Sequence, residues 1–235
     1  LSKEAQQLVA PVKPKESLFD LEKDPFEFND LAKNPDYQSK LIELREAHNQ
    51  WMYNILDVGL IPEAIIRDWE KSKNKPIYQI LREDSSFYND LMLTSSSNNE
   101  KFLQNCLKHP NEAIRYQAAI GLYNLKFRVS DKTISLLQRT LREDQVLNVS
   151  IAAGRALLKF GNKTKNILKK IAEGLAADNE WTRLQSALVT DDFNYAIQNL
   201  ESESKNLVKN DPNKYVVRVL NHALNNLNET NNKVR

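Results

Sequence analysis

Two closely similar stretches decide the fold of this chain: AIGLYNLKF at residues 119–127 and AAGRALLKF at residues 152–160. Both combine small residues with leucines and end on the same Lys-Phe pair. The matched pairs, each 33 residues apart, are Ala119 and Ala152, Gly121 and Gly154, Leu125 and Leu158, and Phe127 and Phe160. Self-similarity at a fixed spacing of this size indicates an internal structural repeat.

Two weaker copies extend the repeat toward the C-terminus. The third copy is WTRLQSAL (181–188), which matches AIRYQAAI (113–120) through an arginine, a glutamine and an alanine at an offset of 68 residues, about 34 per repeat. A more degenerate fourth copy is YVVRVLNHAL (215–224), in which Arg218 follows Arg183 by 35 residues. The repeat therefore has a period of 33–35 residues.

Amphipathic segments lie between these copies and predict further helices, because their apolar residues recur at steps of three and four. These apolar residues are Ile134, Leu137 and Leu141; Ile167, Leu168, Ile171 and Leu175; and Ile197, Leu200 and Leu207. Each repeat is thus predicted to be a pair of antiparallel helices. One pair cannot bury both of its apolar faces alone, so neighbouring pairs should stack. The small residues that would let the helix axes approach closely are Ala118, Ala119, Ala152, Ala153 and Ala187.

The segment HPNEAIRYQAAIGL (109–122) resembles the HEAT signature: a turn with proline or aspartate, then an apolar residue, arginine and a pair of small residues. The tetratricopeptide and ankyrin signatures, which have similar periods, are absent. We therefore expect an all-α fold in which residues 100–235 form a HEAT-like α-solenoid of about four helix pairs. The run TSSSNN (94–99) has the composition of a linker, which would separate these repeats from residues 1–93.

Residues 1–93 should contain one short strand and two to three helices. The strand is expected at Ser17–Leu21, where apolar and polar residues alternate. The helices should open at Asn34, which is a fit N-cap, and after Pro62 and Pro76, because proline suits the first turn of a helix. Glycine is rare in the whole chain, with five residues, and this composition also favours helices.

Composition excludes some classes of function. The chain has 235 residues, 41% of them hydrophobic, and a net charge of +2, so it can bury a core but carries no strong charge bias toward nucleic acid or a membrane surface. No apolar run approaches the ~20 residues that span a bilayer, so we expect no membrane span. The chain begins at Leu1 and has no signal-peptide pattern; we interpret it as a piece of a longer protein.

A search for catalytic or metal-binding motifs is negative. The histidines His48, His109 and His222 are far apart in the sequence, and no zinc-site spacing or glycine-rich phosphate loop is present. The single cysteine, Cys106, occupies an apolar position of a helical pattern and is expected to be a small buried residue. Carboxylates at predicted inter-helix turns are expected to be caps and solvated surface; they include Glu112, Glu143, Asp144, Asp191 and Asp192.

One cluster of charge is open to two interpretations. Five lysines lie within twelve residues and could contact a polyanion, such as a sulfated glycan, along one edge of the solenoid. The alternative is an ordinary solvated helix face. The lysines are Lys159, Lys163, Lys165, Lys169 and Lys170.

A series of short motifs runs in order through the first third of the chain. They are Leu18-Phe19-Asp20-Leu21, Asp24-Pro25-Phe26-Glu27, Asn29-Asp30-Leu31-Ala32, Trp51-Met52 and Asp57-Val58-Gly59-Leu60-Ile61-Pro62-Glu63. As a concatenated string, over about residues 1–83, they resemble the C-terminal tail of the type I sulfatase family. The lead-in LSKEAQQLVAPVKPKES (1–17) is similar to the sequence before this tail in bacterial members that resemble heparan N-sulfatase.

The resemblance implies a parent enzyme that hydrolyses sulfate esters or sulfamates, using a formylglycine and a calcium ion held by Asp and Asn residues. None of those elements has a counterpart here, so this chain is expected to hold no cofactor and to be noncatalytic, with calcium and formylglycine in an upstream catalytic domain. That domain would be the partner of an apolar set made of Leu18, Phe19, Leu21, Phe26 and Phe28. Family habit also implies a periplasmic or secreted location.

Two further functions remain as alternatives. The chain could be an independent HEAT-like scaffold for protein interactions, whose first 80 or so residues only mimic a sulfatase tail. It could also be a HEAT-like enzyme acting on nucleic acid, although the nearly neutral charge disfavours a nucleic-acid partner. In the sulfatase interpretation, the repeats have a structural role or bind a protein or sulfated glycan.

Overall fold

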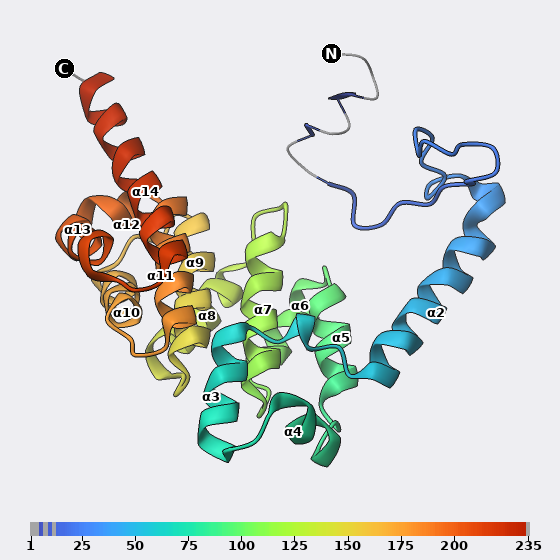
Figure 1. The fold of residues 1–235 in the computed structure, drawn as a ribbon, viewed down its shortest axis with the longest axis horizontal. Coiled ribbons are helices and arrows are strands. Elements are labelled where there is room, and N and C mark those ends of the chain that lie inside the picture. The colour runs from blue at the N-terminus through green and yellow to red at the C-terminus, as the bar shows by residue number, and fades with distance from the viewer. Residues whose placement is uncertain (1–4, 7–8, 11–12, 234–235) are drawn as a thin grey trace. The chain divides into compact units, whose positions relative to one another are not determined.

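The computed structural model describes residues 5–6, 9–10 and 13–233 (Figure 1). These residues divide into two compact units, residues 1–57 and residues 58–235. All regular secondary structure in the described part of the chain is helical, which confirms the all-α prediction. Among the described residues, no helix is both long enough and apolar enough to cross a bilayer.

The strand expected at Ser17–Leu21 was wrong: residues 17–20 are irregular and a turn follows. A strand needs a neighbour with which to form a ladder, and the described residues offer only isolated contacts here. The Leu18 carbonyl accepts from the Leu31 amide at 2.7 Å, and the Leu18 amide donates to the Asp30 carboxylate at 3.0 Å. These two contacts close a loop instead and bury the Leu18 side chain.

The helix predicted after Asn34 consists of two successive elements, a 3₁₀ turn and an α-helix. The Asn34 side chain accepts from the Asp36 amide and caps a 3₁₀ turn, η1 (Pro35–Tyr37), and α2 (Gln38–Ile55) follows at once. Leu56 ends α2 in the left-handed conformation with φ of 51°. Leu41 is the single buried residue of this 18-residue helix.

The second unit opens with short elements: η2 (Val58–Leu60), α3 (Glu63–Lys73), α4 (Ile77–Glu83) and α5 (Tyr88–Ser96). α5 packs against α7 of the repeats, and α3 packs against α11. The expected linker at residues 94–99 lies inside this compact unit, where Thr94–Ser96 still belong to α5 and the Thr94 side chain is fully buried. A change of evolutionary module at residues 94–99 stays a prediction.

The remaining helices alternate along the chain in a helical-repeat-like arrangement (Figure 1). The first helices of the pairs are α6 (Glu100–Cys106), α8 (Asp131–Glu143), α10 (Lys165–Leu175) and α13 (Glu201–Asn210), the last preceded by the short α12 (Asn194–Asn199). The second helices are α7 (Glu112–Asn124), α9 (Leu147–Lys159), α11 (Glu180–Asp192) and α14 (Lys214–Lys233). Each second helix packs against the next, α7 on α9, α9 on α11 and α11 on α14.

One continuous apolar core runs through these pairs, from Leu103 in α6 to Leu220 in α14. The five alanines singled out for close helix approach are all fully buried in the second helices, as predicted. Among the glycines of the repeats, Gly174 of α10 lies closest to a neighbouring helix: an added Cβ would lie 2.0 Å from the Ser186 hydroxyl oxygen of α11. Side chains at the interior positions are therefore limited in size by the neighbouring helix.

The second helices fix the register of the repeat. α7, α9 and α11 each have 13 residues, and they begin at Glu112, Leu147 and Glu180, spacings of 35 and 33. The period agrees with the predicted range of 33–35. The match of Ala119 with Ala152, at an offset of 33, is displaced by two residues from the equivalence that the helix ends give.

Candidate functional site

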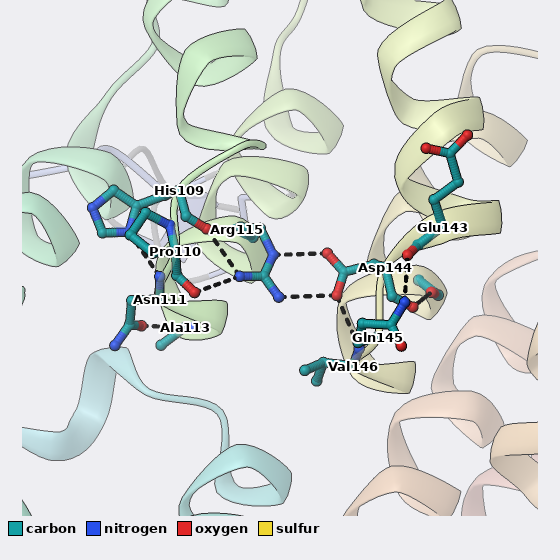
Figure 2. A network of polar contacts seen from close by, with 10 residues as sticks. His109, Pro110, Asn111, Ala113, Arg115, Glu143, Asp144, Gln145 and Val146 are labelled. Carbon is teal, nitrogen blue, oxygen red and sulfur yellow. Dashed lines mark hydrogen bonds and ion pairs between the residues drawn. The ribbon is translucent and has the colours of Figure 1, made fainter.

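A network of polar contacts joins the second helix of the first pair, α7, to the loop before α9 (Figure 2). The Arg115 guanidinium meets the Asp144 carboxylate with two hydrogen bonds, Nε to Oδ2 at 2.7 Å and Nη2 to Oδ1 at 3.0 Å. Its Nη1 donates to the carbonyls of His109 and Pro110 in its own loop. Asp144 Oδ1 also accepts from the amide of Val146, the N-cap residue of α9, at 2.9 Å.

The same arrangement recurs two repeats later. Arg183 Nε donates to Asp211 Oδ2 at 2.7 Å and Nη2 to Oδ1 at 3.2 Å, while Nη1 donates to the carbonyls of Ala177 and Asp178. Asp211 Oδ1 accepts from the Asn213 amide just before α14, as Asp144 does before α9. We call each of these Arg–Asp pairs a rung.

The rung between them is missing, and both of its members are replaced. Arg115 and Arg183 stand four residues after the N-caps of α7 and α11, and Ser150 holds that place in α9. The aspartate place, two residues before the N-cap, is taken by Ala177 before α11. Loss of only one partner would leave a buried charge unpaired, so the joint replacement by small neutral residues is the tolerable way to lose a rung.

A clasp of neutral side chains joins α9 to α11 where the rung is missing. Asn148 Nδ2 donates to Gln185 Oε1 at 2.6 Å and to the Thr182 hydroxyl at 3.2 Å. Gln185 Nε2 returns a bond to the Asn148 carbonyl at 2.9 Å. Asn148 and Thr182 are buried, so this clasp satisfies polar groups that water cannot reach.

The rungs are structural rather than catalytic. The side chains of Arg115 and Asp144 are 15% and 5% exposed, and those of Arg183 and Asp211 are 13% and 1% exposed. Bidentate pairs of this kind occupy the donors and acceptors that a substrate would need. The expectation that Asp144 is a solvated cap was therefore wrong: its carboxylate is buried and ion-paired, and it bonds to the N-cap residue Val146 rather than capping α9 itself.

The other carboxylates of the inter-helix turns also have partners. Glu112 accepts from the Trp69 indole, Glu143 pairs with Arg139, Asp191 contacts His222 at 2.7 Å, and Asp192 pairs with Arg155. Within the described residues, no group of three or more His, Cys, Asp or Glu side chains could hold a metal ion. Burial raises the pKa of the partly buried Cys106 thiol, which does not favour a nucleophile there.

The five predicted polyanion-binding lysines do not share one environment. Lys159 donates to the carbonyls of Tyr123 and Leu125 at the end of α7, and burial lowers its pKa. Lys169 and Lys170 both face Glu173, at 3.9 and 2.9 Å. Lys163 lies 5.7 Å from the centroid of the Tyr195 ring, and it is exposed, as is Lys165. Binding of a polyanion here stays a prediction that depends mainly on Lys163 and Lys165.

The apolar set assigned to a catalytic domain is only partly available on the first unit. Leu18 is buried within its own loop, and Phe19 is half-buried. Leu21, Phe26 and Phe28 are exposed, and the rings of Phe26 and Phe28 stack with centroids 5.9 Å apart. Contact with a separate domain stays a prediction for these three residues.

Sequence reasoning missed a larger apolar surface on α2. Leu44, Trp51 and Ile55 share one face of this helix, and each has about half of its surface exposed. His48 lies between them on the same face and is also exposed. We call these four residues the α2 stripe. The common face can be read from the spacing of these residues, but spacing does not say whether a face is covered by a partner.

Sequence reasoning also missed how α3 is held. Gln117 Nε2 of α7 donates to the Leu60 carbonyl at 2.6 Å. Asn179 Nδ2, at the start of α11, donates to the Ala64 carbonyl at 3.0 Å and to Asp68 Oδ1 at 2.9 Å. A groove of about 790 Å³ lies beside α3, over the starts of α9 and α11. No local pattern predicts these contacts, because their partners are up to 115 residues apart.

One relative among curated proteins supports part of the sequence interpretation. The chain is 43% identical over 79 residues to an ulvan-active sulfatase from Formosa agariphila. This match covers 33% of the chain and 13% of the length of that sulfatase. No family model matches the chain, and no solved structure matches it. The similarity therefore concerns about one third of the chain and a small part of that sulfatase.

Proposed function

We propose that the chain is the noncatalytic C-terminal part of a sulfatase-like protein, in which a sulfatase tail is followed by HEAT-like repeats. The observation that carries this proposal is the 43% identity over 79 residues to a sulfatase, combined with the short part of that enzyme, 13%, that the match represents. This small share is consistent with a noncatalytic fragment, and this sequence has no recognisable catalytic motif.

Several features support the HEAT-like description. The second helices α7, α9 and α11 have equal lengths, and a rung in two of the repeats joins each arginine to an aspartate 28 or 29 residues later. Each second helix packs on its successor, as stacked repeats of a solenoid do. Under this proposal the rungs and the clasp set the spacing of the solenoid, and they leave the ligand-binding surface elsewhere.

The first unit supports the proposed contact with a catalytic domain. α2 has 18 residues but buries only Leu41, and an isolated helix of this length is marginal in water. The α2 stripe and the exposed pair Phe26 and Phe28 form apolar surface that a larger body could cover. We propose that the upstream sulfatase domain covers this surface in the intact protein.

The substrate class and the location follow from the relative and are part of the proposal. The relative is named for its activity on ulvan, so the intact protein is proposed to remove sulfate from a sulfated glycan. Such a substrate lies outside the cytoplasm, and the proposed location is periplasmic or secreted. Calcium and a formylglycine belong to the upstream domain in this proposal.

Two measurements test the proposal together. The coding sequence upstream of Leu1 should encode a sulfatase domain with a Cys/Ser-x-Pro-x-Arg motif, and the intact product should hydrolyse an aryl sulfate with calcium while residues 1–235 alone do not. A stop codon or an unrelated domain upstream would contradict the proposal and favour an independent scaffold. Hydrolysis by the purified 235-residue chain would contradict its noncatalytic assignment.

A further inference from the structure

The segment Val58–Lys73, made of η2 and α3, lies against the starts of two second helices that are not neighbours in the row. Adjacent residues of α3 bond to different second helices: Asp68 accepts from Asn179 at the start of α11, and the Trp69 indole donates to Glu112 at the start of α7. α9, the helix between them, contributes Asn148 to the groove beside α3. The segment therefore bridges the starts of α7 and α11 over that of α9.

The apolar side chains of this segment are buried against the rest of the second unit. Ile61, Ala64, Ile65 and Ile66 are all buried, with the Ile65 side chain only 1% exposed. The Trp69 ring meets Phe87 edge to face, with centroids 5.8 Å apart. The outer side of α3 is polar, and Arg67 there pairs with Glu63 and Glu70. This amphipathic division is that of a helix laid into a groove of a partner.

The repeats also bind the backbone of this segment. Gln117 and Asn179 use their side-chain amides to bind the carbonyls of Leu60 and Ala64. Asn179 has two roles, because its Oδ1 caps α11 by accepting from the Trp181 amide while its Nδ2 holds α3. Asn111 caps α7 in the same way by accepting from the Ala113 amide, but contributes no such bond to α3.

We propose that the surface formed by the starts of α7, α9 and α11 is a helix-binding site, and that its occupant is α3 of the same chain. The repeats thereby anchor the chain at the point where it leaves the first unit. A partner helix in trans can use this surface only when α3 has left it. This inference does not depend on the proposed sulfatase assignment, since it rests on contacts within residues 58–235.

A matched pair of variants tests the polar anchor. Asn179→Asp keeps the oxygen that caps α11 but removes the amide that donates to α3, and it places a second carboxylate beside Asp68. Asn111→Asp makes the same change at the equivalent cap of α7. In hydrogen exchange of the full chain, we expect Asn179→Asp to speed exchange of α3 amides roughly tenfold with α8 and α10 unchanged. Equal α3 exchange in the two variants would overturn the proposal.

A second experiment tests whether the site binds a helix as a ligand. Ile65→Glu with Ile66→Glu should displace α3 in the full chain, since neither charge can be buried there unpaired. A fluorescently labelled peptide of residues 57–76 should then bind this variant in an anisotropy titration and bind the unaltered chain at least about tenfold more weakly. The same peptide carrying both glutamates is the control and should not bind.

The outcomes of the peptide experiment decide between two descriptions of α3. Binding to the variant but not to the unaltered chain shows an occupied site. No binding, in a variant whose α8 and α10 amides keep their protection, shows that α3 is an integral part of the core and overturns the proposal. If the double variant does not fold, the Asn179→Asp and Asn111→Asp comparison decides alone.

Discussion

Replacing Arg115 with serine would give α7 the residue that α9 has at the equivalent position, Ser150, while Asp144 stays in place. The change removes two hydrogen bonds to Asp144 and two to the loop carbonyls of His109 and Pro110. Asp144 would keep its bond from the Val146 amide but lose the positive charge of Arg115. The matched double variant is Arg115→Ser with Asp144→Ala, which reproduces the natural pair of Ser150 and Ala177.

The expected magnitude follows from burial. Removing one partner of a buried ion pair costs ~3–5 kcal/mol, and the partial exposure of Arg115 places this variant near the lower end, at about 3 kcal/mol. Compared with Arg115→Ser, the double variant leaves no buried charge and additionally loses only the hydrogen bond from the Val146 amide to Asp144, which contributes about 1 kcal/mol. We therefore expect the double variant to be more stable than Arg115→Ser by at least about 1 kcal/mol.

The measurement is urea-induced unfolding followed by far-ultraviolet circular dichroism, with the slope of each transition compared, since repeat proteins can lose cooperativity. Arg139→Ser is the control, because its pair with Glu143 is exposed on both sides and should contribute no more than ~0.5 kcal/mol. If the double variant loses as much stability as the two single changes added together, Arg115 and Asp144 are not coupled and the structural role of the rung is refuted.

Three further predictions follow from other sites. Hydrogen bonds from hydroxyls at the start of α8 lower the pKa of Glu100. Glu100→Gln should therefore reduce the free energy of unfolding above the ordinary carboxyl pKa of 4.5, and the difference between variant and unaltered chain should vanish as pH falls through the lowered pKa. Equal losses of stability at pH 3 and pH 7 in urea titrations would contradict this. Gly174→Ala should lower the free energy of unfolding by ~1–3 kcal/mol through overpacking. Gly154→Ala, whose added Cβ meets only ordinary contacts at 3.4 Å, should be neutral or stabilising by up to ~1 kcal/mol. Thermal melts that rank the two variants in reverse order would show the packing argument to be wrong. Lys163→Gln with Lys165→Gln should shorten retention on a dextran sulfate column and leave elution from plain dextran unchanged, and unaltered retention on dextran sulfate would end the polyanion hypothesis.

The sequence predicted the helix pairs, the period and the buried alanines, because these depend on the spacing of small and apolar residues. It misplaced the register of α9 by two residues. Small residues are buried in either register, so Ala152 and Ala153 could not decide between them. The deciding feature is the loop carboxylate Asp144, which has the same role before α9 that Asp211 has before α14.

The rungs could have been found from the sequence. Arg115 and Arg183 were matched as repeat positions, and each is followed by an aspartate 29 or 28 residues later. A recurring arginine and aspartate at this separation, about one helix pair apart, is a signal of a side-chain bond between repeats. What misled the interpretation was the position of Asp144 in a turn, which usually indicates exposure to solvent.

Two other features could not be predicted from the sequence: the position of α3, and the absence of the strand expected at Ser17–Leu21. The first depends on partners that are remote in the sequence, and the second on a partner strand that the described residues lack. Alternating residues form a strand only beside another strand, and α3 is held by Asn179, which local patterns identify only as a helix cap. Tertiary contacts of this kind leave no local signature in a single sequence.

The alternation of the rungs also bears on how the array responds to acid. Arg115 and Arg183 lie 68 residues apart, as do the starts of α7 and α11, while the repeat between them has Ser150 at the arginine position. The charge-paired joints of the array are thus separated by one neutral joint, made of Asn148, Thr182 and Gln185. Acid should therefore weaken the first and third joints, whose aspartates titrate, and leave the middle joint unchanged.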